Sequence, residues 1–245
     1  MLKLERVEKQ YGRFQALQPL DLEIRAGEVF GFLGPNGAGK TTTIRMIAGV
    51  LAPTAGRITI DGLDIALHPV ESKRKVGYVP DRPYLYEKLT AREFLAFVGR
   101  LYGIPREDIT FRSEALLAAH GLLDRADELV EAFSHGMKQR LVLSAALIHE
   151  PPVLVVDEPM VGLDPHGARM IKDLFKSLAA EGRTLFLSTH SLDVAQEVCH
   201  RVGILYKGRL VALGTMDELT ASADLEEVFL RITEEQSEPS AVRAG

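Results

Sequence analysis

A chain of 245 residues, 46% of them hydrophobic, can bury one large core or two coupled cores, so its composition indicates an ordinary globular protein. Its formal charge of -5, with no basic block, argues against a general nucleic-acid-binding surface. The single cysteine, Cys199, excludes an internal disulfide framework and a thiolate zinc cluster within one chain, which fits a reducing compartment.

Short apolar runs separated by helical stretches predict an α/β fold with a partly parallel sheet. Near the start, Leu20, Leu22 and Ile24 alternate with charged residues, which is typical of a half-exposed strand. We expect six further strands, at residues 28–34, 57–60, 76–79, 152–157, 184–189 and 202–206.

A glycine-rich segment follows the first of these runs, where residues 34–42 read GPNGAGKTT between the strand-like EVFGFL and the helical TIRMIAGVL. It matches G-x-x-x-x-G-K-[ST] in the required strand, loop and helix setting, and chance would give this match in about one such chain in a hundred. Backbone N–H groups of such a loop can wrap a phosphate, the lysine can reach the β- and γ-phosphates, and Thr41 can bind magnesium. We call it the phosphate loop and expect its residues to bind a nucleotide: Gly34, Pro35, Asn36, Gly37, Ala38, Gly39, Lys40, Thr41 and Thr42.

A helical insert is expected at about residues 88–150, because no strand pattern occurs between Thr90 and Ile148. Its first helix opens with a capping box formed by Thr90 and Glu93 and closes on Gly103. Further on, residues 133–140 read FSHGMKQR, and Ser134 is the expected N-cap of the helix that follows. Unpaired N–H groups and the positive dipole end at such a start can hold an anion, and a merely capped helix is the alternative.

A second metal anchor is predicted at the end of the apolar run PPVLVVDEP, where Asp157 and Glu158 follow each other. An aspartate in this place can hold magnesium through water. Glu158 is placed to orient and deprotonate an attacking water, which a protein that only binds nucleotide would not need. The sequence therefore favours hydrolysis over simple binding, with two idle surface acids as the alternative.

The last part of the chain is expected to contain a hairpin and a tail. The run YKGRLVALG predicts a hairpin that turns at Lys207 and Gly208. After Leu230 the sequence becomes polar, which is typical of a loose end. We therefore expect one domain at residues 1–219 and a C-terminal extension at residues 220–245.

From about Leu2 to Leu219 the order of these motifs resembles the ATP-binding subunit of ABC transporters. The resemblance implies a P-loop, RecA-like ATPase core with an N-terminal antiparallel β subdomain and an inserted α-helical subdomain. In it, GPNGAGKTT resembles the Walker A loop and VLVVDE resembles Walker B. Tyr11 resembles the aromatic that stacks on adenine, VGLDP resembles the D-loop, which implies that Asp164 lies at the nucleotide, and His190 in STH resembles the catalytic switch histidine. Taken alone, Tyr11 would be a packed strand-end aromatic and His190 a structural histidine.

The FSHGMKQR segment resembles the family's LSGGQxQR signature and keeps Ser134, Gly136, Gln139 and Arg140. In the family this signature faces the ATP bound at the partner subunit's Walker A loop. The resemblance thus implies that Ser134 and Gly136 meet the γ-phosphate of a partner in a head-to-tail dimer. The sequence departs from the signature where His135 replaces the first glycine and Met137 replaces the glutamine.

A second departure lies in VGYVPDRPYLYEKLT, where Asp81 stands in place of the family's Q-loop glutamine. An aspartate is still a hard oxygen ligand for magnesium, and its shorter side chain favours a water bridge. The adjoining RPYLYEKLT begins the helical insert, which in the family docks onto the membrane subunit. We expect movement at this hinge to transmit the nucleotide state to transport.

The resemblance implies an ATP-hydrolysing motor subunit that uses ATP and Mg2+, pairs with an identical or homologous ATPase subunit and moves a separate transmembrane subunit. YLYEKLT, GMKQR and LEEVFLRIT resemble bacterial ABC-2-type export ATPases, which favours an exporter. Cargo contacts would lie in the membrane subunit, so the sequence assigns no cargo.

The alternative function is that of a soluble ABC-type ATPase acting on nucleic acid or the ribosome. Such relatives usually carry a long coiled coil or two ATPase cassettes, and neither occurs here. A small-molecule kinase or a GTPase would share the phosphate loop, but the chain has no [NT]-K-x-D guanine motif, and either function would leave the signature unexplained. No apolar run approaches the roughly 18 residues that span a bilayer, and the start lacks a signal-peptide core. We therefore expect a cytoplasmic protein held at the inner face of the cell membrane by its transmembrane partner, with no nucleic-acid partner.

Overall fold

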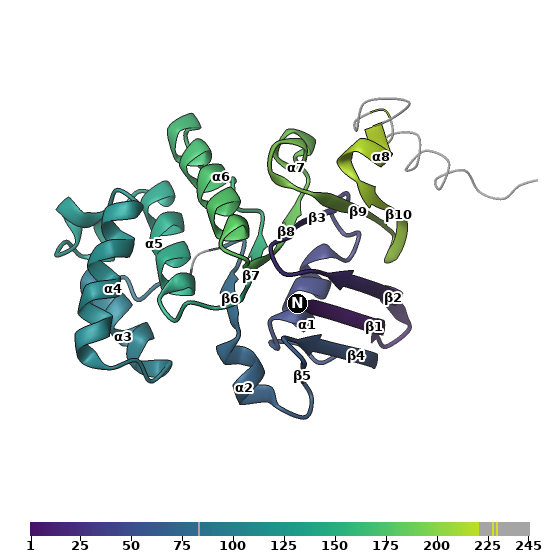
Figure 1. The fold of residues 1–245 in the computed structure, drawn as a ribbon, viewed down its shortest axis with the longest axis horizontal. Coiled ribbons are helices and arrows are strands. Elements are labelled where there is room, and N and C mark those ends of the chain that lie inside the picture. Colours follow the sequence, from purple (N-terminus) through teal and green to yellow (C-terminus); the bar gives the residue numbers. More distant parts are fainter. Residues whose placement is uncertain (83, 221–226, 228, 230–245) are drawn as a thin grey trace, which may run out of the picture.

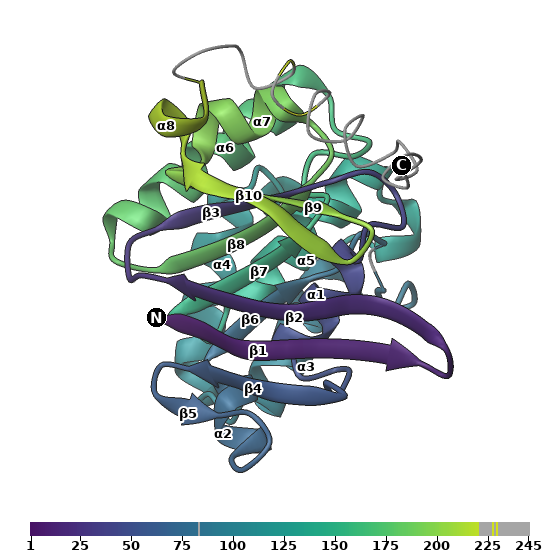
Figure 2. The same ribbon diagram turned by 90° about the vertical axis from the view of Figure 1, so that its right-hand side faces the viewer.

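The computed structural model describes residues 1–82, 84–220, 227 and 229, and its strands form two sheets (Figures 1 and 2). The smaller, antiparallel sheet has the order β2-β1-β4-β5. The half-exposed strand predicted near residue 22 is confirmed, with Leu20, Leu22 and Ile24 buried. The strands are β1 (Leu2–Tyr11), β2 (Phe14–Ile24), β4 (Ala55–Ile60) and β5 (Leu63–Asp64).

The larger sheet has the order β10-β9-β3-β8-β7-β6, and only β10 runs antiparallel to its neighbour. Five of the six strands predicted from apolar runs lie in this sheet, and the sixth, predicted at residues 57–60, is β4 of the smaller sheet. The predicted hairpin turns at Lys207 and Gly208 between β9 and β10. The predicted polar tail lies outside the described residues. The strands are β3 (Val29–Leu33), β6 (Val76–Val79), β7 (Val153–Asp157), β8 (Thr184–Thr189), β9 (Arg201–Tyr206) and β10 (Arg209–Thr215).

Helix α1 (Lys40–Ile47) lies between the two sheets (Figure 2). Its buried Ile44, Met46 and Ile47 share one hydrophobic cluster with side chains from both sheets, including Phe30 of the larger sheet and Leu4 of the smaller one. The other face of the larger sheet is covered by α6 (Pro165–Ala180) and α7 (Leu192–Val198) (Figure 1). Burial on both faces explains why the parallel strands have continuous apolar runs rather than alternating ones. Two further short helices lie outside the helical insert, α2 (Pro69–Arg74) and α8 (Met216–Thr220).

The predicted helical insert is confirmed as α3 (Ala91–Leu101), α4 (Arg106–Ala119) and α5 (His135–Leu147), with two short 3-10 turns, Leu123–Arg125 and Val130–Ala132 (Figure 1). The capping box also forms, because Thr90 Oγ1 accepts from the Glu93 amide at 3.1 Å and the Glu93 carboxylate accepts from the Thr90 amide at 2.8 Å. Helix α5 is apolar on two sides. One side packs on the larger sheet and the other belongs to the insert's own cluster, so α5 joins the insert to the sheet.

One buried histidine gives the insert a predicted acid sensitivity. His120 is 1% exposed, its Nδ1 lies 2.5 Å from Ser144 Oγ, and burial lowers its pKa from 6.5 to about 4. The unfolded chain therefore binds more protons between these values, and stability falls as the pH drops below about 6.5. We expect this histidine to cost the fold about 2 kcal/mol by pH 5, relative to pH 7.5. Urea unfolding at both pH values should show a smaller loss in His120→Asn, and equal losses would contradict the assignment.

Candidate functional site

The phosphate loop connects the end of β3 to the start of α1, in the setting that its motif requires. Gly39 has a φ of +111°, and a Cβ atom there would lie 2.6 Å from the carbonyl oxygen of Ala16. Only glycine fits this position, since both the dihedral angle and the close backbone approach exclude a side chain. The loop thus turns tightly into the N-terminus of α1, where unpaired backbone N–H groups are available to an anion.

Lys40 is the first residue of α1 and is only 6% exposed. Its Nζ donates to the carbonyl oxygens of Gly34 at 2.6 Å and Pro35 at 3.2 Å. Burial lowers the pKa of this ammonium, while the nearby carboxylates of Glu158 and Asp157 act in the opposite direction. A cation held in this way beside backbone N–H groups is well suited to a phosphate chain.

Asp157 ends strand β7 and is 1% exposed. Its Oδ1 accepts a hydrogen bond from Ser188 Oγ on the neighbouring strand β8. Its Oδ2 is buried without a hydrogen-bond partner. A buried carboxylate oxygen without a partner is costly, so a ligand such as a water bound to a metal would satisfy it. The unpartnered Asp157 Oδ2 therefore fits the predicted role of Asp157 as a magnesium ligand.

Glu158 lies between Lys40 and His190, which come from different strand ends. Its Oε1 is 4.0 Å from Lys40 Nζ, and its Oε2 is 2.9 Å from His190 Nδ1. The carboxyl ends of β3, β7 and β8 are adjacent in the sheet, which brings the three residues together. Glu158 is largely buried, with 14% of its side chain exposed, whereas 61% of the His190 side chain is exposed.

Lys40 and Glu158 open into a cavity of about 340 Å³, and His190 is not among the residues that line it. The cavity is also lined by other residues of the phosphate loop and by Tyr11, Phe14, Ala16, Asp81 and Asp157. Tyr11 and Phe14 face each other across the β1-β2 turn and are 47% and 64% exposed. Sequence reasoning selected Tyr11 and missed Phe14. The signal was a second aromatic two residues beyond Gly12, at the start of the next strand.

The three predicted metal ligands lie near one another. Thr41, Asp81 and Asp157 line both this cavity and a neighbouring one of about 490 Å³ that also contacts Tyr78 and Tyr84. Among the described residues, no group of three or more His, Cys, Asp or Glu side chains is arranged to hold a metal ion. Magnesium in proteins commonly keeps several water ligands and is bound through only one or two carboxylates.

The signature segment at residues 133–140 lies at a different cavity. Ser134 Oγ caps α5 by accepting from the Met137 amide at 3.3 Å, and Asp164 Oδ1 caps α6 by accepting from the Gly167 amide at 2.6 Å. Both residues, with Gly136, line a cavity of about 360 Å³ that shares no lining residue with the phosphate-loop cavity. The structure thus brings Ser134, Gly136 and Asp164 to one another, and it does not bring them to the phosphate loop of the same chain.

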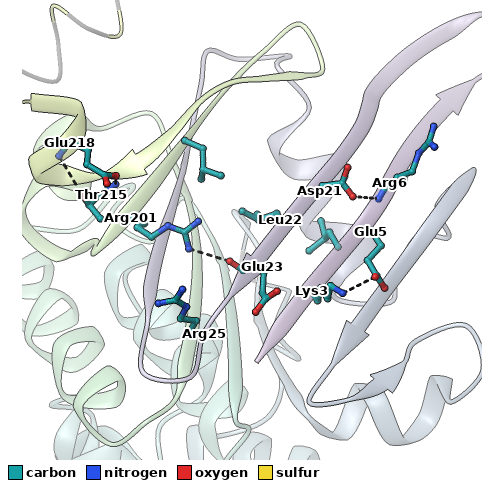
Figure 3. Close-up of a pocket in the computed structure, with 12 residues that line it drawn as sticks. Lys3, Glu5, Arg6, Asp21, Leu22, Glu23, Arg25, Arg201, Thr215 and Glu218 are labelled. Carbon is teal, nitrogen blue, oxygen red and sulfur yellow. Dashed lines mark hydrogen bonds and ion pairs between the residues drawn. The ribbon is translucent and has the colours of Figure 1, made fainter.

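A larger cavity, of about 940 Å³, contains none of the predicted site residues (Figure 3). It lies among β1, β2, β9 and β10 and is lined mainly by charged side chains. Several of these groups bond to one another, as Lys3 does with Glu5 at 2.7 Å and Arg201 does with the Glu23 carbonyl at 3.2 Å. The phosphate-loop cavity, which contains the predicted catalytic groups, is smaller than this one, so cavity size alone would select the wrong site.

No helix in the described part of the chain combines the length and the apolar character needed to cross a membrane.

Comparison with known proteins agrees with the motif order. Residues 17–161 match the family described as ABC transporter. The chain is 39% identical over 219 residues to the linearmycin resistance ATP-binding protein LnrL of Bacillus subtilis (strain 168), covering 89% of this chain and 70% of that protein. It is 39% identical over 231 residues to Nod factor export ATP-binding protein I of Paraburkholderia xenovorans (strain LB400), covering 93% and 76%. A dimeric ATP-binding cassette solved in a post-hydrolysis state with ADP and Pi superposes with a TM-score of 0.81 at 27% identity, covering 88% of this chain and 99% of the other.

Proposed function

The chain belongs to the ABC transporter family as one of its ATP-binding, ATP-hydrolysing subunits of the export type, and we propose that it is the motor of a membrane exporter. In this proposal two ATPase subunits pair head to tail and drive separate transmembrane subunits. The observation that supports head-to-tail pairing is that the phosphate loop and Ser134 line separate cavities of one chain, which share no residue. The exporter assignment is supported by relatives named as export and resistance ATP-binding proteins.

Nucleotide binding is assigned to the phosphate loop and the aromatic residues beside it. Backbone N–H groups of the phosphate loop surround the phosphates, and Lys40 neutralises their charge. Tyr11 stacks on the adenine ring, and the exposed Phe14 offers a second aromatic surface at the same cavity. Thr41, Asp157 and Asp81 would hold Mg2+, and the buried, unpartnered Asp157 Oδ2 supports this assignment. Bound Mg2+ would supply positive charge to the phosphate oxygens.

Hydrolysis is assigned to Glu158. His190 Nδ1 lies 2.9 Å from Glu158 Oε2, so the histidine fixes that oxygen, and Oε1 accepts the proton of an attacking water. The water oxygen then bonds to the γ-phosphorus while the bond between the γ-phosphorus and the β,γ-bridging oxygen breaks, and that oxygen leaves with ADP. Lys40, 4.0 Å from Oε1, holds positive charge beside the reacting phosphate throughout.

The second half-site, formed by Ser134, Gly136 and Asp164, is assigned to the nucleotide of the partner subunit. Helices α5 and α6 both begin at this cavity, and the positive dipole end and unpaired N–H groups of each N-terminus favour an anion. A head-to-tail dimer would place the partner's γ-phosphate there. The second subunit can be identical or homologous.

The membrane partner is assigned to the surface where the insert begins. Tyr84 and Tyr86 follow Asp81 in the chain and are 81% and 60% exposed, and large exposed aromatic side chains are common at protein interfaces. We assign residues 1–219 to the ATPase domain, about 88–150 to its helical insert and 220–245 to a C-terminal extension. Docking through this surface places the chain at the inner face of the cell membrane.

Co-purification from detergent-solubilised native membranes tests this assignment. The tagged full chain should retain a multi-span membrane protein in about equal amount, and Tyr84→Ala/Tyr86→Ala should lose it because the exposed rings are removed. Phe111→Ala is the matched control, since Phe111 is a 76% exposed aromatic on α4, and it should keep the partner. ATP binding should be equal in all three proteins. Equal recovery with both variants would contradict the docking surface, and absence of any membrane partner from the unmodified chain would contradict the exporter.

A further inference from the structure

His135 makes a contact that the family's signature glycine could not make. It is the first residue of α5, directly after the N-cap Ser134. Its imidazole lies against Gly162, because a Cβ atom built on Gly162 would be 2.4 Å from His135 Cδ2 and 2.8 Å from Nε2. Any side chain at position 162 would therefore overlap the ring, and the glycine's φ of +75° disfavours one as well.

The contact joins the helical insert to the loop at residues 161–164. This loop starts three residues after Glu158 and ends at Asp164, the N-cap of α6. Two backbone hydrogen bonds hold the chain between Glu158 and this loop in tight turns. The Val161 amide donates to the Glu158 carbonyl and the Leu163 amide donates to the Met160 carbonyl, both at 3.3 Å. Next to His135, Gly136 faces the same loop, since its Cβ would lie 3.5 Å from Leu163 Cδ2. The start of α5 and the loop thus pack as one unit.

We propose that His135 is a positioning residue for ATP hydrolysis, whose ring holds Ser134 and Asp164 in a fixed relation so that both meet the partner's nucleotide together. This inference rests on the proposed function. The His135 ring adds a side-chain contact between the start of α5 and the loop that leads into α6, beside the approach of Gly136 to Leu163. Placement errors of about an ångström in a catalytic site are enough to lower a rate substantially. Binding of ATP at the chain's own phosphate loop is independent of the contact, because His135 does not line that cavity.

Replacing His135 with Gly, the residue of the resembled signature, separates positioning from folding and from binding. We expect kcat to fall about tenfold, because without the ring Ser134 and Asp164 are positioned less accurately in the assembled dimer site, whereas initial ATP binding does not involve them. The affinity of the monomer for ATP and the melting temperature should stay unchanged. His135→Phe should restore kcat to within about threefold, because a planar ring again covers Gly162. Failure of Phe to restore the rate would show that the imidazole nitrogens matter and would overturn a packing role.

A double-mutant cycle with Gly162→Ala tests the contact itself. The added methyl group overlaps the ring only when His135 is present, whereas the backbone cost of alanine at positive φ is the same in both backgrounds. Gly162→Ala should therefore lower kcat about tenfold in the unmodified chain and less than about threefold in His135→Gly. Equal effects in the two backgrounds, or an unchanged kcat in His135→Gly, would overturn the proposal. Failure of the proposed function would be recognised separately. In that case the unmodified chain would hydrolyse no ATP, or its ATP hydrolysis would persist in Lys40→Ala.

Discussion

Glu158→Gln is expected to slow ATP hydrolysis at least about a hundredfold while ATP binding remains, because glutamine keeps the size of the side chain and cannot accept the proton of the attacking water. The geometry favours loss of hydrolysis without loss of ATP binding. Glu158 reaches His190 at 2.9 Å and Lys40 only at 4.0 Å, so a neutral amide leaves the lysine's bonds to the Gly34 and Pro35 carbonyls in place. Phosphate release measures turnover, and equilibrium dialysis of ATP measures binding.

Lys40→Ala is the matched comparison for this experiment. The lysine ammonium would contact the phosphates in the ground state as well as in the transition state, so its loss should weaken binding itself. Turnover by Glu158→Gln at the unmodified rate would remove Glu158 from the role of general base. Loss of ATP binding in Glu158→Gln would also contradict the assignment, because it would place the carboxylate in nucleotide binding rather than in catalysis.

A mixed dimer is expected to trap one nucleotide when one protomer carries Lys40→Ala and the other carries Ser134→Arg. Each head-to-tail site combines the phosphate loop of one chain with Ser134 of the other. One site of the mixed dimer therefore collects both lesions, and the other site is intact. With Glu158→Gln in both chains to block hydrolysis, each parental homodimer should trap none. Two different affinity tags isolate the mixed dimer, and retained radiolabelled ATP reports trapping.

The same experiment distinguishes sites built in one chain from sites built between chains. If Ser134 served the phosphate loop of its own chain, every site in the mixed dimer would carry one lesion and none would trap ATP. Pairing each mutant with a protomer that has Lys40 and Ser134 leaves one intact site under either arrangement, and this pairing controls for weak single-site closure. Trapping in these controls but not in the double-mutant mixture would contradict the head-to-tail assignment.

The order of local motifs could be read from the sequence, because each depends on residues close together in the chain. The phosphate loop needs only a strand, nine consecutive residues and a helix, and Asp157 and Glu158 are adjacent at a strand end. Strand β1 was missed for a local reason as well. Its buried Leu2, Leu4 and Val7 break the alternation of period two where Arg6 adopts a φ of +48° and the pairing with β2 shifts register.

The contacts within the site depend on tertiary structure, because they join residues from separate strands and helices. Glu158 meets His190 and Lys40 since β7, β8 and β3 are neighbours in the sheet, and strand order cannot be read from hydrophobic periodicity. Strand pairing brings Phe14 opposite Tyr11 at the nucleotide cavity. The sequence by itself determined which chemical groups this protein carries and on which local elements. Only the packing of distant elements decided which of those groups meet, including His135 and Gly162, because such contacts depend on the path of the whole chain.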